Sequence, residues 1–385
     1  MLKSAAKVAR KKSAGIDGIS AKSIKGDILE NYEMIYQEIL TDRYRPNKVL
    51  LKRIPKGNGK YRTLAIGTAI DRVILGCIYE YLYPGFDAGM SEYSYGFRKG
   101  KNCQQEIQTI INICDQENKW VTKIDLQNCF DFIDHDKILF MLRRKVEDKG
   151  LLRLLNQFMK VSYVNGRNEK KNLVGAPQGN SLSPLYANMI LDAVDKMLNK
   201  QGHRYVRYAD DLFIFCQRQV AAHRTLDMTK NFIERHCKLR VNEEKTRICS
   251  VEHGFNALGF HIYESNGEIH VVPKSESVQE IRQLLKHEIR RGRVDILPDR
   301  INEILRGWIA YYKIAEMSRI TRSLDLYIQK QIRMVEKERS VNINKNNIIN
   351  CNKLWKEGTP ASDHITDGAA ASGQQARANC SETFF

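Results

Sequence analysis

The chain has 385 residues, too many for one small hydrophobic core and enough for two or three domains. Its 62 Lys and Arg outnumber its 45 Asp and Glu, and the formal net charge of +17 makes nucleic acid the default partner. The nine cysteines form no C-x-x-C pair, the first residues lack the apolar core of a signal peptide, and no apolar run reaches membrane-spanning length, so we expect a cytoplasmic protein without a zinc finger or a membrane partner.

The N-terminal part of the chain begins with a basic segment and continues with helix and hairpin patterns. Residues 1–13 contain five Lys or Arg and no acid, which predicts a basic arm or helix against a phosphate backbone. Apolar residues at helical spacing predict a helix over 21–45, and two short runs joined by a Gly/Asn loop predict a hairpin of strands 49–54 and 61–66. Further helical patterns cover 69–83 and 100–116.

The middle of the chain alternates strands and helices. The segment "KWVTKIDLQNCFDFIDH" at 119–135 begins as a strand and breaks into a turn or helix. Residues 172–202 predict a loop followed by a long amphipathic helix, and strands flank Asp210 and Asp211. "VNEEKTRI" and "NALGFHIY" predict strands or loops. Helices are also expected over 136–160 and 219–236.

The C-terminal part changes to helices only. Apolar residues at helical spacing predict helices over 277–291, 298–313 and 318–338, which would form a separate helical module after a mixed body. The tail after Trp355 is small, polar and aperiodic, so we expect it to be disordered or loosely attached.

Two adjacent aspartates interrupt an apolar stretch at "VRYADDLFIF". On these residues alone, Asp210 and Asp211 form either a hairpin tip, because Asp is a common turn residue, or a divalent metal site, which needs carboxylates on a rigid element. Asp125 lies near the end of another apolar strand, "VTKIDL", where a lone Asp could also be a strand-end cap. Two such strands side by side would bring the three carboxylates together.

Three converging carboxylates repel one another strongly unless cations lie between them. With two Mg²⁺ ions, or Mn²⁺ as a substitute, such a cluster makes a site for in-line phosphoryl transfer. Together, Asp125, Asp210 and Asp211 therefore favour the metal site over a turn without chemistry.

The order of the sequence blocks resembles that of reverse transcriptases, and within them the group II intron-encoded type. The matching blocks are "AGIDGIS", "IPKGNGKYRTLAIGTAIDRVI", "SEYSYGFRKGKNC", "KIDLQNCFDFIDHDKI", "GAPQGNSLSPLYANMILDAVDKML", "VRYADDLFIF", "NEEKTRI" and "LGF". The helical "RGWIAYYKIAEM" and "LDLYIQKQIRMV" resemble the family's thumb or maturase domain. The resemblance covers about residues 14–338, and many blocks in one order are a far more specific signal than any single block.

This resemblance implies an α+β fold of the right-hand polymerase type. The expected parts are an N-terminal basic segment with the fingers (1–118), a palm with an antiparallel sheet and the catalytic carboxylates (119–275, interleaved with the fingers), an all-helical thumb or maturase domain (276–340) and a polar, disordered tail (341–385).

The resemblance also implies roles for single residues at the reaction centre. Asp125, Asp210 and Asp211 are the implied metal ligands, with Asp210 the more direct ligand of the adjacent pair. Lys245 is the implied general acid that protonates the leaving pyrophosphate. Phe130, five residues after Asp125, is the implied steric gate that excludes a 2′-hydroxyl. Without the resemblance, Lys245 could be a surface lysine and Phe130 an ordinary core residue.

Further residues are implied to bind the substrates. Lys56 and Arg62 at the hairpin tip would grip the incoming triphosphate, although either could be a solvated surface charge. Gln178 in "APQG" would line the nucleotide pocket, and Arg98 would contact a phosphate or the template. The implied primer grip is Leu258, Gly259 and Phe260, where glycine allows a close backbone approach. Residues expected in the thumb core rather than on a base-stacking platform are Trp308, Tyr311 and Tyr312.

We therefore expect an RNA-directed DNA polymerase that also binds its intron RNA as a splicing maturase and supports intron mobility. Its partners would be intron or template RNA, a DNA primer or RNA–DNA hybrid, and deoxynucleoside triphosphates. No Cys pairs or His clusters follow the thumb, so we expect no HNH endonuclease domain. Two alternatives stay open: a domesticated reverse transcriptase (diversity-generating, CRISPR-associated or phage-defence) and an RNA-binding maturase without polymerase activity.

Overall fold

The computed structural model describes residues 1–385 except residues 11–12, 58–59, 167, 177–178 and 359–385. Contacts divide the chain into two units, the first made of Met1–Ile113 and Glu117–Ile248, the second of Cys114–Gln116 and the chain from Cys249 onward. Both units combine helices with sheets, so the predicted α+β class is confirmed. None of the described helices is both long enough and apolar enough to cross a membrane.

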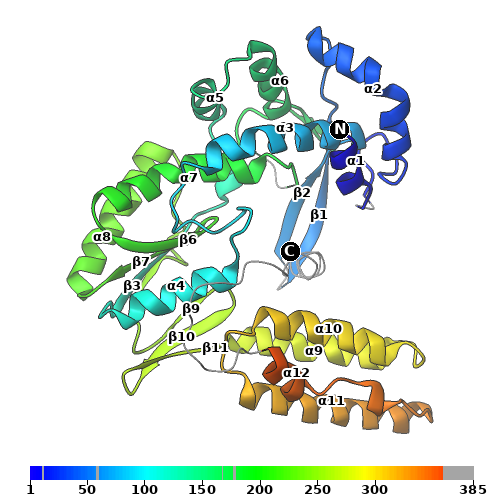
Figure 1. The fold of residues 1–385 in the computed structure, drawn as a ribbon, viewed down its shortest axis with the longest axis vertical. Helices are drawn as coiled ribbons and strands as arrows, with labels where there is room; N and C mark the ends of the chain where they lie inside the picture. Colours follow the sequence, from blue (N-terminus) through cyan, green and yellow to red (C-terminus); the bar gives the residue numbers. More distant parts are fainter. Residues whose placement is uncertain (11–12, 58–59, 167, 177–178, 359–385) are drawn as a thin grey trace. The chain divides into compact units, whose positions relative to one another are not determined.

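The first unit has helices before, between and after its strands (Figure 1). In chain order its elements are α1 (Leu2–Ala9), α2 (Ile24–Leu40), β1 (Val49–Gly57), β2 (Lys60–Ile66), α3 (Ala69–Asp87), α4 (Cys103–Asp115), β3 (Trp120–Asp125), the 3-10 helix η1 (Cys129–Phe132), α5 (His135–Arg143), α6 (Lys149–Met159), β4 (Tyr163–Asn165), β5 (Asn168–Lys170), α7 (Ser183–Lys200), β6 (Arg204–Tyr208), β7 (Asp211–Cys216), α8 (Gln219–Phe232), the π-helix η2 (Ile233–Cys237) and β8 (Arg247–Ser250). One sheet has the strand order β2-β1-β4-β5 and the other β6-β7-β3-β8.

The basic N-terminal segment forms a helix that packs into the first unit. On α1, Ser4 Oγ donates a hydrogen bond to the Val73 carbonyl of α3 at 3.0 Å, and Lys7 pairs with Glu80 at 2.7 Å. The predicted helix is thus confirmed over Leu2–Ala9, and its contact with a phosphate backbone stays a prediction. Its apolar positions follow the helical period, and α3 offers them a hydrophobic surface to cover.

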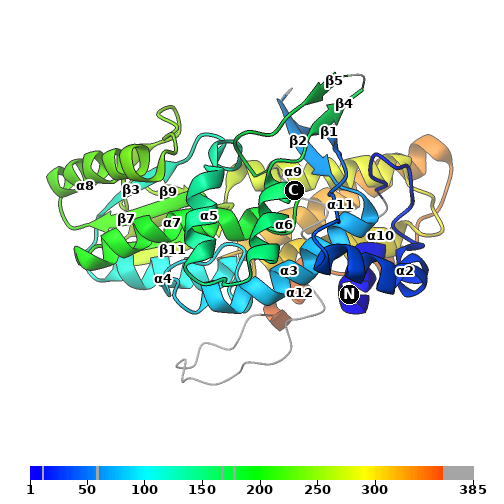
Figure 2. The ribbon, with the colours of Figure 1, turned by 90° about the horizontal axis from the view of Figure 1, so that it is seen from above.

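The predicted hairpin is confirmed and belongs to a larger sheet. Strands β1 and β2 pair antiparallel, with Leu50 opposite Ile66 and Ile54 opposite Arg62. The other edge of β1 pairs in parallel with β4, and Figure 2 shows the β4–β5 hairpin beside β1 and β2. This sheet carries the two cations that were expected to meet the triphosphate.

The second sheet of this unit brings distant strands together. Strand β7 pairs antiparallel with β3 from Trp120 opposite Cys216 to Asp125 opposite Asp211. Strand β6 pairs antiparallel with the other edge of β7. Helix α8 covers β3 and β7, where Thr122 Oγ1 donates to the Ala222 carbonyl at 3.1 Å.

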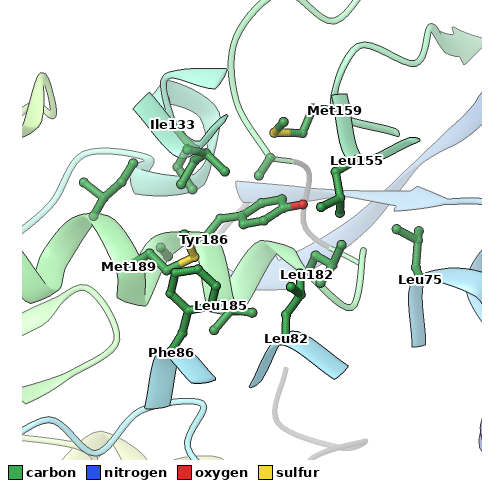
Figure 3. Close-up of a cluster of buried hydrophobic side chains, with 14 of the residues drawn as sticks. Leu75, Leu82, Phe86, Ile133, Leu155, Met159, Leu182, Leu185, Tyr186 and Met189 are labelled. Carbon is green, nitrogen blue, oxygen red and sulfur yellow. The ribbon is translucent and has the colours of Figure 1, made fainter. Parts of the chain in front are cut away.

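A hydrophobic core joins α3, α6 and α7. Figure 3 shows Tyr186 of α7 at its centre, surrounded by apolar side chains from these helices and from the segments that precede α5 and α7. Labelled neighbours are Leu75, Leu82, Phe86, Ile133, Leu155, Met159, Leu182, Leu185 and Met189. Burial holds the pKa of Tyr186 above its ordinary value, so the phenol is neutral. Helix α7 is therefore anchored through its whole length.

One predicted helix is two helices in the structure. The pattern over 136–160 predicted a single element, but α5 ends at Arg143 and α6 begins at Lys149. Asp148 ends the break, because its carboxylate accepts a hydrogen bond from the Leu151 amide at 3.0 Å and caps α6. Such a cap favours a new helix start over continuation of the old one.

The second unit joins a small sheet to helices. Its elements are β9 (Phe255–Ala257), β10 (Phe260–Ser265), β11 (Glu268–Pro273), α9 (Ser275–Arg291), α10 (Leu297–Tyr311), α11 (Ser318–Arg339), the 3-10 helix η3 (Lys345–Asn347) and α12 (Cys351–Gly358). The strands form an antiparallel sheet of order β11-β10-β9. The unit boundary at 248/249 lies earlier than the predicted palm–thumb boundary, because this sheet bonds to the helices that follow it, as between the Glu316 amide and the Val271 carbonyl at 2.8 Å.

The segment after α11 differs from the predicted disordered tail. Residues 341–358 contain η3 and α12, and Cys351 is fully buried. Asp325 of α11 accepts a hydrogen bond from the Cys351 amide at 2.8 Å, and Asn302 of α10 donates to the Asn347 carbonyl at 2.6 Å. These polar anchors lie far apart in sequence, so composition alone did not reveal them; residues 359–385 lie outside the described part.

Candidate active site

The adjacent aspartates lie at a two-residue hairpin turn. Tyr208 and Asp211 pair across it, and Ala209 and Asp210 form the turn. Ala209 has φ +55°, a conformation that L side chains rarely adopt. Because Asp211 also lies opposite Asp125 on β3, the turn places all three carboxylates at one end of the sheet. The hairpin interpretation and the clustering of the carboxylates are thus one arrangement.

The carboxyl group of Asp211 is perturbed by its surroundings at this sheet end. Burial, with the charges of Asp210 and Asp125 adding to it, raises the pKa of Asp211 to about 6, although Lys123 and Lys245 oppose the shift. Burial and the two neighbouring carboxylates therefore both disfavour the charged form of Asp211.

Lys245, the implied general acid, lies beside the Asp125 carboxylate. Its Nζ is 3.4 Å from both Oδ1 and Oδ2 of Asp125, and the Lys245 side chain is 58% exposed. The segment that carries it is fixed to β3, since the Asn242 amide donates to the Asp125 carbonyl at 2.8 Å and the Asp125 amide donates to Thr246 Oγ1 at 3.3 Å. Lys245 therefore stays close to Asp125 yet can reach solvent.

The fit of this site to a metal ion rests on donor chemistry and backbone register. Among the residues that the structure describes, no three His, Cys, Asp or Glu side chains are grouped closely enough to hold a metal ion. The β3–β7 register nevertheless sets Asp125 opposite Asp211 with Asp210 adjacent, and carboxylates are the ligands that Mg²⁺ prefers. The Lys245 ammonium against both Asp125 oxygens indicates that this sheet end accommodates a cation.

A buried ion pair supports the turn, and the sequence analysis did not identify it. Arg207 is 1% exposed, and its Nη2 and Nε lie 2.5 and 2.9 Å from the Asp195 carboxylate oxygens. Its Nη1 donates to Asn188 Oδ1 and to the Ala209 carbonyl, both at 2.9 Å. Burial alone lowers the pKa of Arg207, but Asp195 raises it above its ordinary value, so the guanidinium stays charged. A fixed cation thus holds the carbonyl just before Asp210.

A second contact with the turn comes from residues 93–98, here called the 93–98 loop. The Arg207 amide donates to the Tyr93 carbonyl at 2.9 Å, and Asn188 Nδ2 donates to the Gly96 carbonyl at 2.9 Å. A Cβ on Gly96 would lie 2.2 Å from the Ala209 amide nitrogen, closer than atoms approach. Only glycine at position 96 lets the loop lie flat against the turn.

Arg98, at the end of this loop, does not have the predicted role. Its side chain is 8% exposed, and Nε pairs with Asp87 Oδ1 at 2.6 Å. Nη1 donates to the carbonyls of Ser91 and Ser94 at 2.5 and 2.8 Å. The predicted phosphate or template contact is corrected: the guanidinium is used inside the protein to fix the 93–98 loop.

Phe130, the implied sugar gate, lies on η1 shortly after the Asp125 strand. Its carbonyl accepts a hydrogen bond from the Ala176 amide at 2.8 Å, which joins it to the loop that precedes α7. Gln178 in that loop and the side chain of Lys56 lie outside the described residues. Arg62 lies on β2, opposite Ile54.

The implied primer-grip residues belong to the second unit, where they form a turn held by aromatic side chains. Leu258 and Gly259 connect β9 to β10 with φ +47° and +81°. Tyr311 Oη donates to the Leu258 carbonyl at 2.8 Å, and the Phe260 ring stacks on Tyr311 with ring centroids 5.6 Å apart. Trp308 and Tyr312 are buried, at 4% and 5% exposed, which confirms them as core residues of this unit.

Comparison with known proteins identifies the family. Residues 54–262, more than half of the chain, match the reverse transcriptase (RNA-dependent DNA polymerase) family. The chain belongs to the reverse transcriptase family. Residues 275–355 match the group II intron maturase-specific domain, so the reverse transcriptase carries a maturase domain after its polymerase part, as the sequence blocks predicted. This match includes η3 and reaches into α12, which the predicted thumb range did not.

Individual relatives agree with this reverse transcriptase assignment. Protein YkfC of Escherichia coli (strain K12) is 26% identical over 67% of this chain and 78% of that protein. The putative COX1/OXI3 intron 1 protein of Saccharomyces cerevisiae is 26% identical over 64% of this chain and 36% of that protein. The group II intron-encoded protein LtrA of Lactococcus lactis subsp. cremoris is 28% identical over 62% of this chain and 39% of that protein. The chain thus matches less than half the length of the two intron proteins.

Sequence signals for the missed residues did exist in this reverse transcriptase. Arg207 lies between Val206 and Tyr208 in the mostly buried strand β6, and Asp195 lies among the buried positions of α7. A buried charge requires a partner, so the sequence could have indicated that Arg207 and Asp195 each need one. Glu106 of α4 is a further buried acid, and burial followed by the charge of Asp211 holds its pKa well above the ordinary range.

Proposed function

We propose that this reverse transcriptase is an active RNA-directed DNA polymerase that also acts as a group II intron maturase. The observation that carries the proposal is the register that sets Asp125 opposite Asp211, with Asp210 in the adjoining turn. Paired carboxylates at a rigid strand end are what metal-assisted phosphoryl transfer requires. A chain whose only task was RNA binding would have no need of three partly buried carboxylates at one sheet end.

In this proposal the three carboxylates hold two Mg²⁺ ions, with Mn²⁺ as a substitute. The bound ions would supply charge stabilisation to the triphosphate and activation of the primer hydroxyl. Asp125 and Asp211 face each other from neighbouring strands, and Asp210 approaches from the turn that Arg207 supports. The network around Arg207 would keep the carboxylates in place while substrates exchange.

Lys245 and the β1–β2 hairpin complete the proposed reaction site. Lys245 lies 3.4 Å from Asp125 and is largely exposed, so it can leave that carboxylate and donate a proton to the departing pyrophosphate. Arg62 and Lys56 would bind the triphosphate of the incoming deoxynucleotide, Gln178 would line the nucleotide pocket, and Phe130 would exclude a 2′-hydroxyl.

The maturase part of the proposal rests on charge and on the C-terminal helices. One face of α11 carries three cations together with apolar and amide side chains: Leu326, Gln329, Lys330, Arg333, Met334 and Lys337. Together with the net charge of +17, this cationic face suits the phosphates of an intron RNA. Template RNA and a DNA primer would be the partners of the polymerase part.

The test is extension of a DNA primer on an RNA template with Mg²⁺. We expect synthesis by the wild type and background signal only from Asp210→Asn with Asp211→Asn, because the metal ligands are lost while side-chain size is kept. The matched control is Asp227→Asn with Glu234→Gln, which also removes two acids, both exposed, and should leave synthesis unchanged.

Two outcomes would contradict the proposal. Equal synthesis by the wild type and the Asp210/Asp211 variant would remove these residues from the reaction. If the wild type bound a group II intron RNA but extended no primer, the chain would be a maturase without polymerase activity.

A further inference from the structure

Phe97 combines two features that rarely occur together. Its ring is 46% exposed, although Phe is a residue that folding normally buries. Its backbone has φ +61°, the left-handed region that costs a bulky residue free energy. Neither feature improves the stability of the chain, so the position calls for another explanation.

The residues on either side hold Phe97 in this conformation. Gly96 lies against Ala209, where an added Cβ would come within 2.2 Å of the backbone nitrogen. Arg98 is fixed by Asp87 and by the carbonyls of the same loop. With both neighbours anchored, Phe97 cannot relax without releasing either the catalytic turn or the buried Arg98.

The constrained ring of Phe97 packs against Phe130. The two ring centroids are 6.0 Å apart with an interplanar angle of 74°, the edge-to-face arrangement that aromatic pairs favour. Phe130 itself is only partly buried on the short helix η1. The 93–98 loop therefore joins the Ala209 turn to the Phe130 ring through consecutive residues.

We propose that Phe97 is a positioning residue for sugar discrimination. It acts by packing against the Phe130 ring and limiting its rotation, so that the ring stays under the sugar of the incoming nucleotide. A ring free to turn aside would leave room for a 2′-hydroxyl, whereas a braced ring excludes it. The inference deepens the proposed function and rests on it, because it concerns the nucleotide that the polymerase selects.

The experiment measures sugar discrimination, the ratio of kcat/KM for a deoxynucleotide to that for the matching ribonucleotide, in primer extension. We expect the ratio to fall about 3- to 10-fold in Phe97→Ala and Phe97→Gly, the range that corresponds to the loss of one aromatic pair. The fall should come from faster ribonucleotide insertion, with deoxynucleotide kcat close to that of the wild type. Phe97→Tyr keeps the ring and should keep the ratio.

Two comparisons separate positioning from folding. Phe97→Gly relieves the φ +61° strain that Phe97→Ala retains, so a shared fall in discrimination cannot come from backbone destabilisation. Phe140→Ala removes another exposed Phe, 64% exposed on α5, and should leave the ratio unchanged. In a Phe130→Ala background, Phe97→Gly should lower the ratio no further, because its effect passes through the Phe130 ring.

Each negative outcome has a separate meaning. Wild-type discrimination in Phe97→Ala and Phe97→Gly of an active chain, with a lowered ratio in Phe130→Ala, overturns this inference and leaves the proposed function standing. An additive effect of the two positions overturns the route through Phe130. A wild-type chain without primer extension overturns the proposed function, and the inference with it.

Discussion

Two hairpin turns, one in each unit, are alike in length and unlike in support. Ala209–Asp210 joins β6 to β7, and Leu258–Gly259 joins β9 to β10, each with a non-glycine residue at positive φ. The first turn is held by the guanidinium of Arg207, which is paired with a buried carboxylate. The second is held by phenol hydroxyls and stacked rings.

The difference teaches what each kind of support provides. A buried ion pair holds its two side chains in one orientation. Loss of either partner leaves an uncompensated charge in the protein interior. Water can replace a phenol hydroxyl at a partly buried carbonyl, so removing such a hydroxyl lowers the stability only modestly. Asp210 and Asp211 repel each other and must still keep their positions. A buried ion pair is the kind of support that such residues need.

The largest expected effect comes from breaking the ion pair. Asp195→Leu should lower the free energy of unfolding of the first unit by about 3–5 kcal/mol, because Arg207 remains buried and unpaired. Adding Arg207→Met should recover most of this loss, yet primer extension should stay impaired, since nothing then holds the Ala209 carbonyl. Urea unfolding, followed by the fluorescence of Trp120 with Trp308 and Trp355 changed to Phe, measures the stability.

The control for this pair lies on the same helix. Lys196, whose side chain is 65% exposed, pairs with the 13% exposed Asp192 one turn away on α7, and because the ammonium lies at the surface, Lys196→Met should change the free energy of unfolding by less than about 1 kcal/mol. If the Asp195/Arg207 double variant were as active as the wild type, the ion pair would serve stability alone and the contrast between the two turns would disappear.

An intermediate effect is expected at the second turn from Gly259→Ala. A Cβ there would lie 2.9 Å from Tyr312 Oη, and φ is +81°, so we expect a loss of about 1–2 kcal/mol in the second unit. Adding Tyr312→Phe removes the atom that the Cβ meets and should recover part of the loss. Urea unfolding reported by Trp308 measures both variants, and strictly additive losses would show that the φ value alone accounts for the cost.

The smallest effect is expected from Tyr311→Phe. This change removes the hydrogen bond to the Leu258 carbonyl but keeps the ring that stacks on Phe260, so the second unit should lose only about 0.5–1.5 kcal/mol. The same unfolding measurement tests it. A loss as large as that of Asp195→Leu would mean that the two turns are supported with equal rigidity.

Sequence reasoning succeeded wherever a short pattern contained the whole signal. The β1–β2 hairpin, the strand before Asp125 and the turn at Asp210 were predicted from alternating apolar residues and turn residues. The reasoning failed at Arg98, which became an internal anchor, at the 136–160 helix, which a capping Asp148 divides, and at 341–358, which is ordered by distant polar partners.

By itself, the sequence determined many of the helices and strands, the order of the sequence blocks and the three carboxylates of this reverse transcriptase, because hydrophobic periodicity and block order are local properties. The tertiary structure decided which polar groups, far apart in the sequence, meet one another. Asn188 bonds to Gly96 across 92 positions, and Lys245 pairs with Asp125 across 120. A buried charge must find a partner, but the sequence does not say which one, since the partner depends on how the chain packs.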